Sequence, residues 1–134
     1  IGAKVGNPNR QVIAILGDGG SQMNIQELGT IMQSGIDVKI VLLNNSFLGM
    51  VRQWQELFFN RRYSFTHLDN PDFQQLVSSY RIATAKISRP SEIEESVKQM
   101  LESDGAYFLE VQVKEEENVF PMIPAGATLD EMIF

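Results

Sequence analysis

Two short apolar segments, each followed at once by a small polar cluster, constrain the fold of this chain more than any other feature. Segment 11–16 ends in the cluster Gly17–Gly19, and segment 38–43 ends in the cluster Asn44–Asn45. The 24 residues between the two clusters can hold one helix and a second strand. If the two strands are parallel, both clusters emerge at the carboxyl edge of the sheet, where open α/β sheets bind ligands. The clusters are therefore expected to lie close together.

The residue types in the clusters indicate which ligand that edge binds. Asp18 offers a carboxylate and Asn45 a carboxamide oxygen, and Mg²⁺ usually takes one or two carboxylates and completes its shell with waters and substrate phosphate oxygens. Glycines beside Asp18 allow the backbone to approach a phosphate closely, and the start of a following helix offers unpaired N–H groups. The Walker and dinucleotide loops fit poorly, because their lysine and glycine spacings are missing. We therefore expect Mg²⁺ bridging to a diphosphate.

A wider set of motifs makes the chain similar to a known enzyme family. Gly-Asp-Gly followed at this distance by Asn-Asn resembles the signature of enzymes that use thiamine diphosphate. Further segments resemble the carboxyl-terminal part of the acetolactate synthase (acetohydroxyacid synthase) large subunit; they are Met23–Leu28, Gly49–Gln55, Asn70–Phe73 and Pro121–Gly126. The resemblance extends over nearly all of the 134 residues.

The resemblance implies condensation of two 2-oxo acids, pyruvate with pyruvate or 2-oxobutanoate, in the biosynthesis of branched-chain amino acids such as valine and isoleucine. It implies thiamine diphosphate and Mg²⁺ as cofactors, and FAD bound by a part of the parent enzyme outside this chain. It also implies a homodimer or homotetramer of large subunits, a regulatory small subunit and a cytoplasmic location. Two alternatives stay open: another thiamine diphosphate-dependent 2-oxo acid decarboxylase or oxidase, and a non-catalytic assembly module that keeps the fold.

Matching the family's motifs to this sequence assigns candidate site residues. The metal ligands implied are the side chains of Asp18 and Asn45 and the backbone carbonyl of Phe47. Met50 and Trp54 are implied to shape the substrate pocket. The residues implied to contact the cofactor are Gly17, Asp18, Gly19, Gly20, Asn45, Gly49 and Met50. The family's activating glutamate belongs to an amino-terminal domain of a partner subunit, so no catalytic residue is assigned here and the chain alone is expected to be inactive.

Two residues, Trp54 and His67, have a simpler interpretation from the sequence alone. The apolar stripe that contains Trp54 has the period of an amphipathic helix, and such a stripe is better explained by core packing than by substrate contact. His67 is the only histidine, and without a second nitrogen or sulfur donor nearby it is expected to be a hydrogen-bonded loop residue rather than a ligand.

Composition excludes several functional classes. The chain has 11 basic and 17 acidic residues and a formal net charge of −6 at pH 7, and an acidic chain without a basic stripe argues against nucleic-acid binding. No apolar run reaches the length of a membrane span, and no stretch resembles a signal peptide. With no cysteine, the chain can form neither disulfides nor thiolate metal sites.

The periodicity predicts a doubly wound α/β fold with a mostly parallel sheet, incomplete at its N-terminus. The expected strands are 11–16, 38–43, 83–87 and 106–113, and the first two are expected to be buried on both faces because they are almost continuously apolar. The expected helices are 24–34, 50–59, 70–80 and 90–104. Asn24 with Glu27 is expected to cap the first helix, and Asn70 is expected to cap the third.

The domain boundary is expected near residue 113. Residues 1–113 are expected to form part of a carboxyl-terminal thiamine diphosphate-binding domain, and the opening Ile1–Lys4 reads as the tail of a helix, so the chain is expected to be a fragment. Residues 114–134 lose the periodic pattern and become rich in acidic residues, proline and glycine. They are expected to be a tail that is either a lid over the site or disordered.

Overall fold

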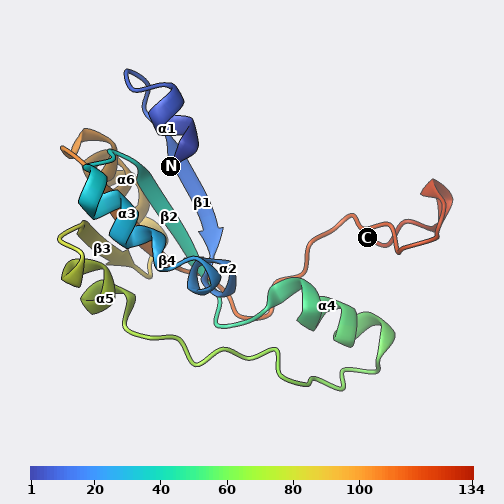
Figure 1. Ribbon diagram of the computed structural model, residues 1–134. Helices are drawn as coiled ribbons and strands as arrows, with labels where there is room; N and C mark the ends of the chain where they lie inside the picture. Colours follow the sequence, from blue (N-terminus) through green and yellow to red (C-terminus); the bar gives the residue numbers. More distant parts are fainter.

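The computed structural model describes residues 1–134, and its centre is a parallel sheet of four strands (Figure 1). The strands are β1 Ile13–Gly17, β2 Lys39–Asn44, β3 Ala83–Ile87 and β4 Tyr107–Gln112. Their order across the sheet is β1-β2-β4-β3, and every neighbouring pair is parallel. The predicted parallel sheet is therefore confirmed, and its four strands lie where the apolar segments predicted them.

Helices lie on both faces of this sheet, as a doubly wound fold requires (Figure 1). The α-helices are α1 Gly2–Gly6, α2 Asp18–Met23, α3 Glu27–Ser34, α4 Gly49–Phe58, α5 Phe73–Ser79 and α6 Ile93–Glu102, and two short 3₁₀ helices span Pro90–Glu92 and Leu129–Glu131. None of these helices is long and apolar enough to cross a membrane.

Two apolar clusters hold the layers together. The larger joins α3 and α5 to one face of the sheet and contains Leu28, Ile31, Val38, Ile40, Leu42, Phe73, Val77, Ile82 and Phe108. The smaller joins α6 to the other face and contains Ile87, Met100, Tyr107 and Leu109. Since neighbouring residues of a strand point to opposite faces, Phe108 and Leu109 of β4 belong to different clusters.

The prediction that the first strand is buried on both faces is wrong for this structure. Strand β1 lies at an edge of the sheet, and Ile13 and Ile15 are 48% and 68% exposed. Ala14, which points to the opposite face, packs against the larger cluster. Strand β1 is therefore covered on one face only, because α6, the helix on the other face, packs on β3 and β4.

Two predicted helix caps are also wrong. Instead of opening one helix with Glu27, Asn24 ends α2, and a turn separates α2 from α3, which has no side-chain cap. Asn70 does not cap α5 either; the carboxylate of Asp72 accepts the N–H of Gln75 and does so instead. The side chain of Asn70 is thereby left free to bond elsewhere.

Helix α4 and the chain on either side of it extend from the carboxyl edge of the sheet (Figure 1). A long connection leads from α4 to α5, and the tail after β4 returns past α4 before it runs outward (Figure 1). In the tail, Met122 and Ile133 form an antiparallel bridge. The role of this tail as a lid or a disordered end stays a prediction.

Candidate functional site

A cavity of about 650 Å³ opens at the carboxyl ends of β1 and β2. All of the residues predicted to bind cofactor or metal line it, namely Gly17, Asp18, Gly19, Gly20, Asn45, Phe47, Gly49 and Met50. The rest of its wall consists of Leu43, Leu48, Val51, Val113, Lys114, Glu117, Asn118 and Val119. The structure thus brings the two polar clusters of the sequence to one place, as the parallel topology predicted.

Asp18 is the first residue of α2 and follows β1 directly. Its side chain is almost completely buried, at 1% exposure. The Gly19 N–H donates to its Oδ1 over 3.0 Å and the Asn70 Nδ2 donates to its Oδ2 over 2.6 Å. A carboxylate has about four acceptor positions, so two hydrogen bonds leave positions at which Asp18 can bind a cation.

The backbone turns sharply between the two other proposed ligands. Ser46, which separates Asn45 from Phe47, has φ of 56°, a left-handed conformation that is uncommon for a residue other than glycine. Two side chains stabilise the turn, because the Ser46 N–H donates to Asn44 Oδ1 and the Phe47 N–H donates to Asn45 Oδ1, each over 3.2 Å. A carboxamide oxygen accepts two hydrogen bonds, so Asn45 Oδ1 keeps a free lone pair.

A second segment fastens this turn from outside. The Leu48 N–H donates to the carbonyl of Thr66, and the Leu68 N–H donates to the carbonyl of Ser46, each over 2.8 Å. Thr66 is buried although it belongs to the long connection after α4. The turn that carries the proposed ligands is therefore held both by its own side chains and by a backbone pairing.

Two glycines of the cavity wall leave little space for a side chain. A Cβ on Gly19 would lie 2.7 Å from the Cδ2 atom of Leu48, and a Cβ on Gly49 would lie 3.2 Å from the Nδ2 atom of Asn45. The glycine at position 49 thus leaves room for the side chain of a proposed metal ligand. At Gly17 and Gly20, by contrast, the space is open.

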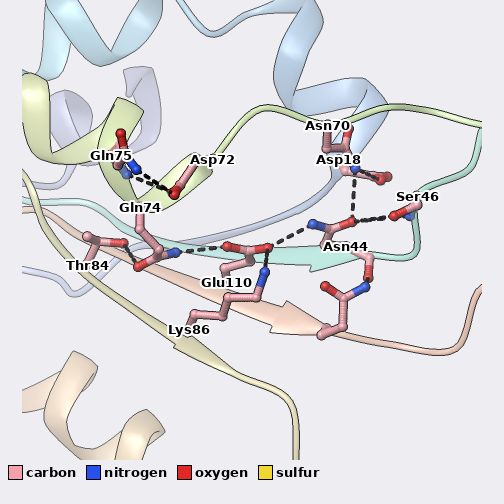
Figure 2. A network of polar contacts seen from close by, with 11 residues as sticks. Asp18, Asn44, Ser46, Asn70, Asp72, Gln74, Gln75, Thr84, Lys86 and Glu110 are labelled. Carbon is pink, nitrogen blue, oxygen red and sulfur yellow. Dashed lines mark hydrogen bonds and ion pairs between the residues drawn. The ribbon is translucent and has the colours of Figure 1, made fainter.

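A polar network that the sequence patterns did not predict joins Asp18 to strands β3 and β4 (Figure 2). The buried carboxylate of Glu110 accepts hydrogen bonds from Asn44 Nδ2 over 2.8 Å, Gln74 Nε2 over 2.9 Å and Lys86 Nζ over 2.9 Å. Asn44 is joined through its Oδ1 to Asn70. One sequence feature could have indicated this network: two largely apolar strands each contain a charged residue, Lys86 in β3 and Glu110 in β4.

Helix α4 also binds the beginning of the tail. Gln53 exchanges two hydrogen bonds with the backbone of Val119, over 3.0 and 2.8 Å. Arg52 is fully buried, donates to Asn118, and forms an ion pair with Glu56 over 3.0 Å. Because Asn118 and Val119 line the cavity, these contacts make the tail a part of the cavity wall.

Two residues singled out from the sequence lie outside the cavity. Trp54 is 38% exposed and packs on Phe58, with ring centroids 5.2 Å apart, one helical turn beyond Met50. It is therefore not a core residue, and its role in substrate choice stays a prediction. His67 is exposed, and its ring packs edge-on against Phe47 with centroids 5.2 Å apart.

The donor set of the cavity fits a hard cation with phosphate oxygens. No group of three or more histidine, cysteine, aspartate or glutamate side chains is arranged to hold a metal ion, so a site for Zn²⁺ of the usual kind is absent. One buried carboxylate, one carboxamide oxygen and one backbone carbonyl suit Mg²⁺, which binds few protein ligands and takes the others from water and phosphate. Asp18, Asn45 and Phe47 therefore fit the metal that the motifs imply.

Comparison with known proteins agrees with this geometry. Residues 1–111 match the family model for the thiamine pyrophosphate enzyme, C-terminal TPP binding domain, where TPP is thiamine diphosphate. The chain is 51% identical to the acetolactate synthase isozyme 2 large subunit of Escherichia coli (strain K12), in a match that covers 99% of this chain and 24% of that protein. It is 46% identical to the acetolactate synthase large subunit of Lactococcus lactis, in a match that covers 99% of this chain and 23% of that protein. The chain thus spans about a quarter of the length of the curated relatives it matches.

A solved structure leads to the same fold. The chain is similar to a thiamine diphosphate-dependent 4-hydroxybenzoylformate decarboxylase of Rhodococcus jostii RHA1, with a TM-score of 0.80 and 26% identity over 88% of this chain and 22% of that one. The cavity at the carboxyl edge, the oxygen ligands around Asp18 and the match over residues 1–111 lead to one conclusion. The chain belongs to the family of C-terminal thiamine diphosphate-binding domains of thiamine diphosphate enzymes.

Proposed function

We propose that this chain is the carboxyl-terminal, cofactor-binding part of an acetolactate synthase large subunit, which condenses pyruvate with a second pyruvate or with 2-oxobutanoate. The observation that carries the proposal is that Asp18, Asn45 and Phe47 line one cavity with Met50. The identities of 46–51% to two acetolactate synthase large subunits support this activity over that of a decarboxylase, for which the structural relative has 26% identity.

Each part of the cavity has a task in this proposal. The Asp18 carboxylate, the Asn45 carboxamide oxygen and the Phe47 carbonyl would hold Mg²⁺, and Gly17 and Gly20 would leave the backbone open to the diphosphate. When bound, thiamine diphosphate supplies the electron sink for decarboxylation of a 2-oxo acid. The apolar wall around Met50 would exclude water from the reacting atoms.

The wider assembly is also a proposal. We infer that the complete enzyme forms a homodimer or homotetramer of large subunits, works with a regulatory small subunit in the cytoplasm, and carries FAD outside these residues. The names of the relatives, which are large subunits, support a small subunit as partner. The activating glutamate would come from another subunit, since the glutamate at the cavity wall of this chain, Glu117, has a largely exposed side chain paired with Lys114.

The test is a product assay on the full-length subunit that carries this chain. With pyruvate, thiamine diphosphate and Mg²⁺, we expect acetolactate to form, and we expect its formation to stop when a chelator removes Mg²⁺. Release of carbon dioxide and free aldehyde without acetolactate would contradict the proposal in favour of a decarboxylase. The 134-residue chain alone should form no acetolactate under the same conditions, and turnover by the pure chain would contradict the proposed dependence on a second subunit.

A further inference from the structure

We propose that Asn70 is a positioning residue that fixes the carboxylate of Asp18 for binding the metal ion. The proposal deepens the proposed function and rests on it, because it concerns the same cation site. It assigns a role to a residue that lies 52 positions from Asp18 in the sequence and outside both clusters that define the cofactor motif.

The orientation of the Asn70 amide is determined by its neighbours. Gln22 Nε2 donates to Asn70 Oδ1 over 2.7 Å. With the oxygen of the amide facing this donor, the nitrogen faces the other side, where it donates to Asp18 Oδ2 over 2.6 Å and to Asn44 Oδ1 over 3.0 Å. Both hydrogens and the oxygen of the amide are thus in use. A flipped amide would direct its oxygen at the Asp18 carboxylate and lose the hydrogen bonds to Asp18 and Asn44.

The orientation of Asn44 is fixed in the same way. Its Nδ2 donates to Glu110 Oε1 over 2.8 Å, so its Oδ1 faces Asn70. The ammonium group of Lys86 donates to the same Glu110 oxygen over 2.9 Å. Figure 2 shows these side chains as one connected row from Lys86 to Asp18. The row thus ends in a donor of Asn70, and not an acceptor, that faces Asp18.

The row of hydrogen bonds prepares the Asp18 carboxylate for binding a metal ion. Asp18 is held through both oxygens, by the Gly19 N–H at Oδ1 and by Asn70 at Oδ2, so its carboxylate plane is fixed before a cation arrives. Outer partners that orient a metal ligand in this way contribute about 10–100-fold to metal affinity.

The neighbouring segment argues against a purely local role for Asn70. The sequence Asn70–Phe73 looks like a helix start, but the cap of α5 is supplied by Asp72, which accepts the Gln75 N–H over 3.0 Å. Asn70 makes its hydrogen bonds to α2 and to the end of β2 instead. Its contacts thus join the helix that carries Asp18 to the strand that leads directly into Asn45.

The test measures Mn²⁺ as the probe ion in the full-length subunit, with thiamine diphosphate present at saturation. Free Mn²⁺ is measured from its electron paramagnetic resonance signal, and the melting temperature of each cofactor-free protein is measured in parallel. Asn70→Leu keeps the shape of the side chain and removes its donors. We expect the dissociation constant for Mn²⁺ to rise by about 10–100-fold. Should Asn70→Leu not fold, Asn70→Ala in the same assay decides the question.

The matched control is Asp72→Ala. It removes the cap of α5, two residues away, without touching Asp18. It should lower the melting temperature and leave the affinity for Mn²⁺ unchanged, which separates positioning from a general loss of stability. Unchanged affinity in the Asn70 variant would overturn the inference and leave the proposed function intact. Absence of Mn²⁺ binding in the unaltered protein would overturn the proposed metal site, and the inference with it.

Discussion

Replacing Trp54 by leucine distinguishes two roles that the sequence left open. If the indole were a core residue, its loss would cost the roughly 3–5 kcal/mol that is typical of large-to-small aromatic changes. The structure gives a smaller value, because Trp54 is 38% exposed and its aromatic partner is Phe58. Leucine keeps part of this contact, so we expect the free energy of unfolding to fall by only about 1–2 kcal/mol.

Substrate choice is expected to change together with stability. Trp54 lies one turn beyond Met50, which lines the cavity. The family resemblance implies that Trp54 shapes the substrate pocket, and we infer that its indole contacts the additional methyl group of 2-oxobutanoate. One methyl or methylene group in an apolar pocket contributes about 1–3 kcal/mol to discrimination. The preference for 2-oxobutanoate over pyruvate should therefore fall by roughly tenfold or more in Trp54→Leu.

The assay is a competition between the two acceptors in the full-length enzyme, in which the ratio of acetohydroxybutyrate to acetolactate is measured beside a denaturation curve. Phe58→Leu is the matched control, because it breaks the same aromatic pair one turn further from Met50. It should destabilise the protein by a similar amount and leave the product ratio unchanged. An unchanged ratio in Trp54→Leu would refute the role in substrate choice.

Two further predictions follow from single contacts. Gly49→Ala places a Cβ 3.2 Å from the amide nitrogen of Asn45, which must shift to make room. Titration with Mn²⁺ should therefore show weakened binding while the melting temperature changes little, and equal affinity would contradict the expected displacement of the Asn45 amide. The pKa of Glu92 is lowered to about 2 by the Arg89 side chain and by the N–H groups of Ser88 and Arg89. The ionised carboxylate therefore stabilises the fold at pH values above the usual pKa of a glutamate. This contribution disappears as the pH falls towards 2. Glu92→Gln should therefore lower the melting temperature at pH 7 and lose that effect near pH 2, and a difference independent of pH would contradict this assignment.

The sheet and the cavity could be predicted because they depend on local patterns. Two apolar segments with polar clusters at their ends are sufficient to place Asp18 and Asn45 at the same edge of a parallel sheet, and the structure has both residues in one cavity. The burial of β1 could not be predicted in this way. Its apolar pattern is that of a strand covered on both faces, whereas none of these 134 residues covers the face of Ile13 and Ile15.

The polar network could not be predicted, because it joins residues that are distant in sequence. Asn70 has the type and the position of a helix cap, and only the three-dimensional arrangement shows that Asp72 takes that role while Asn70 reaches Asp18. Glu110 and Lys86 are 24 residues apart, and their pairing depends on the order β1-β2-β4-β3. A strand order of this kind is not contained in the periodicity of any one segment.

The central claim, that Asp18 holds the metal that binds the diphosphate, is tested most directly by a calorimetric titration of thiamine diphosphate into the full-length subunit in the presence of Mg²⁺. Asp18→Ala removes the proposed carboxylate ligand, and Asp104→Ala removes an exposed carboxylate from a loop that does not line the site cavity. We predict that cofactor affinity falls by orders of magnitude in Asp18→Ala and is unchanged in Asp104→Ala. Equal affinity in the unaltered protein and in Asp18→Ala would contradict the account.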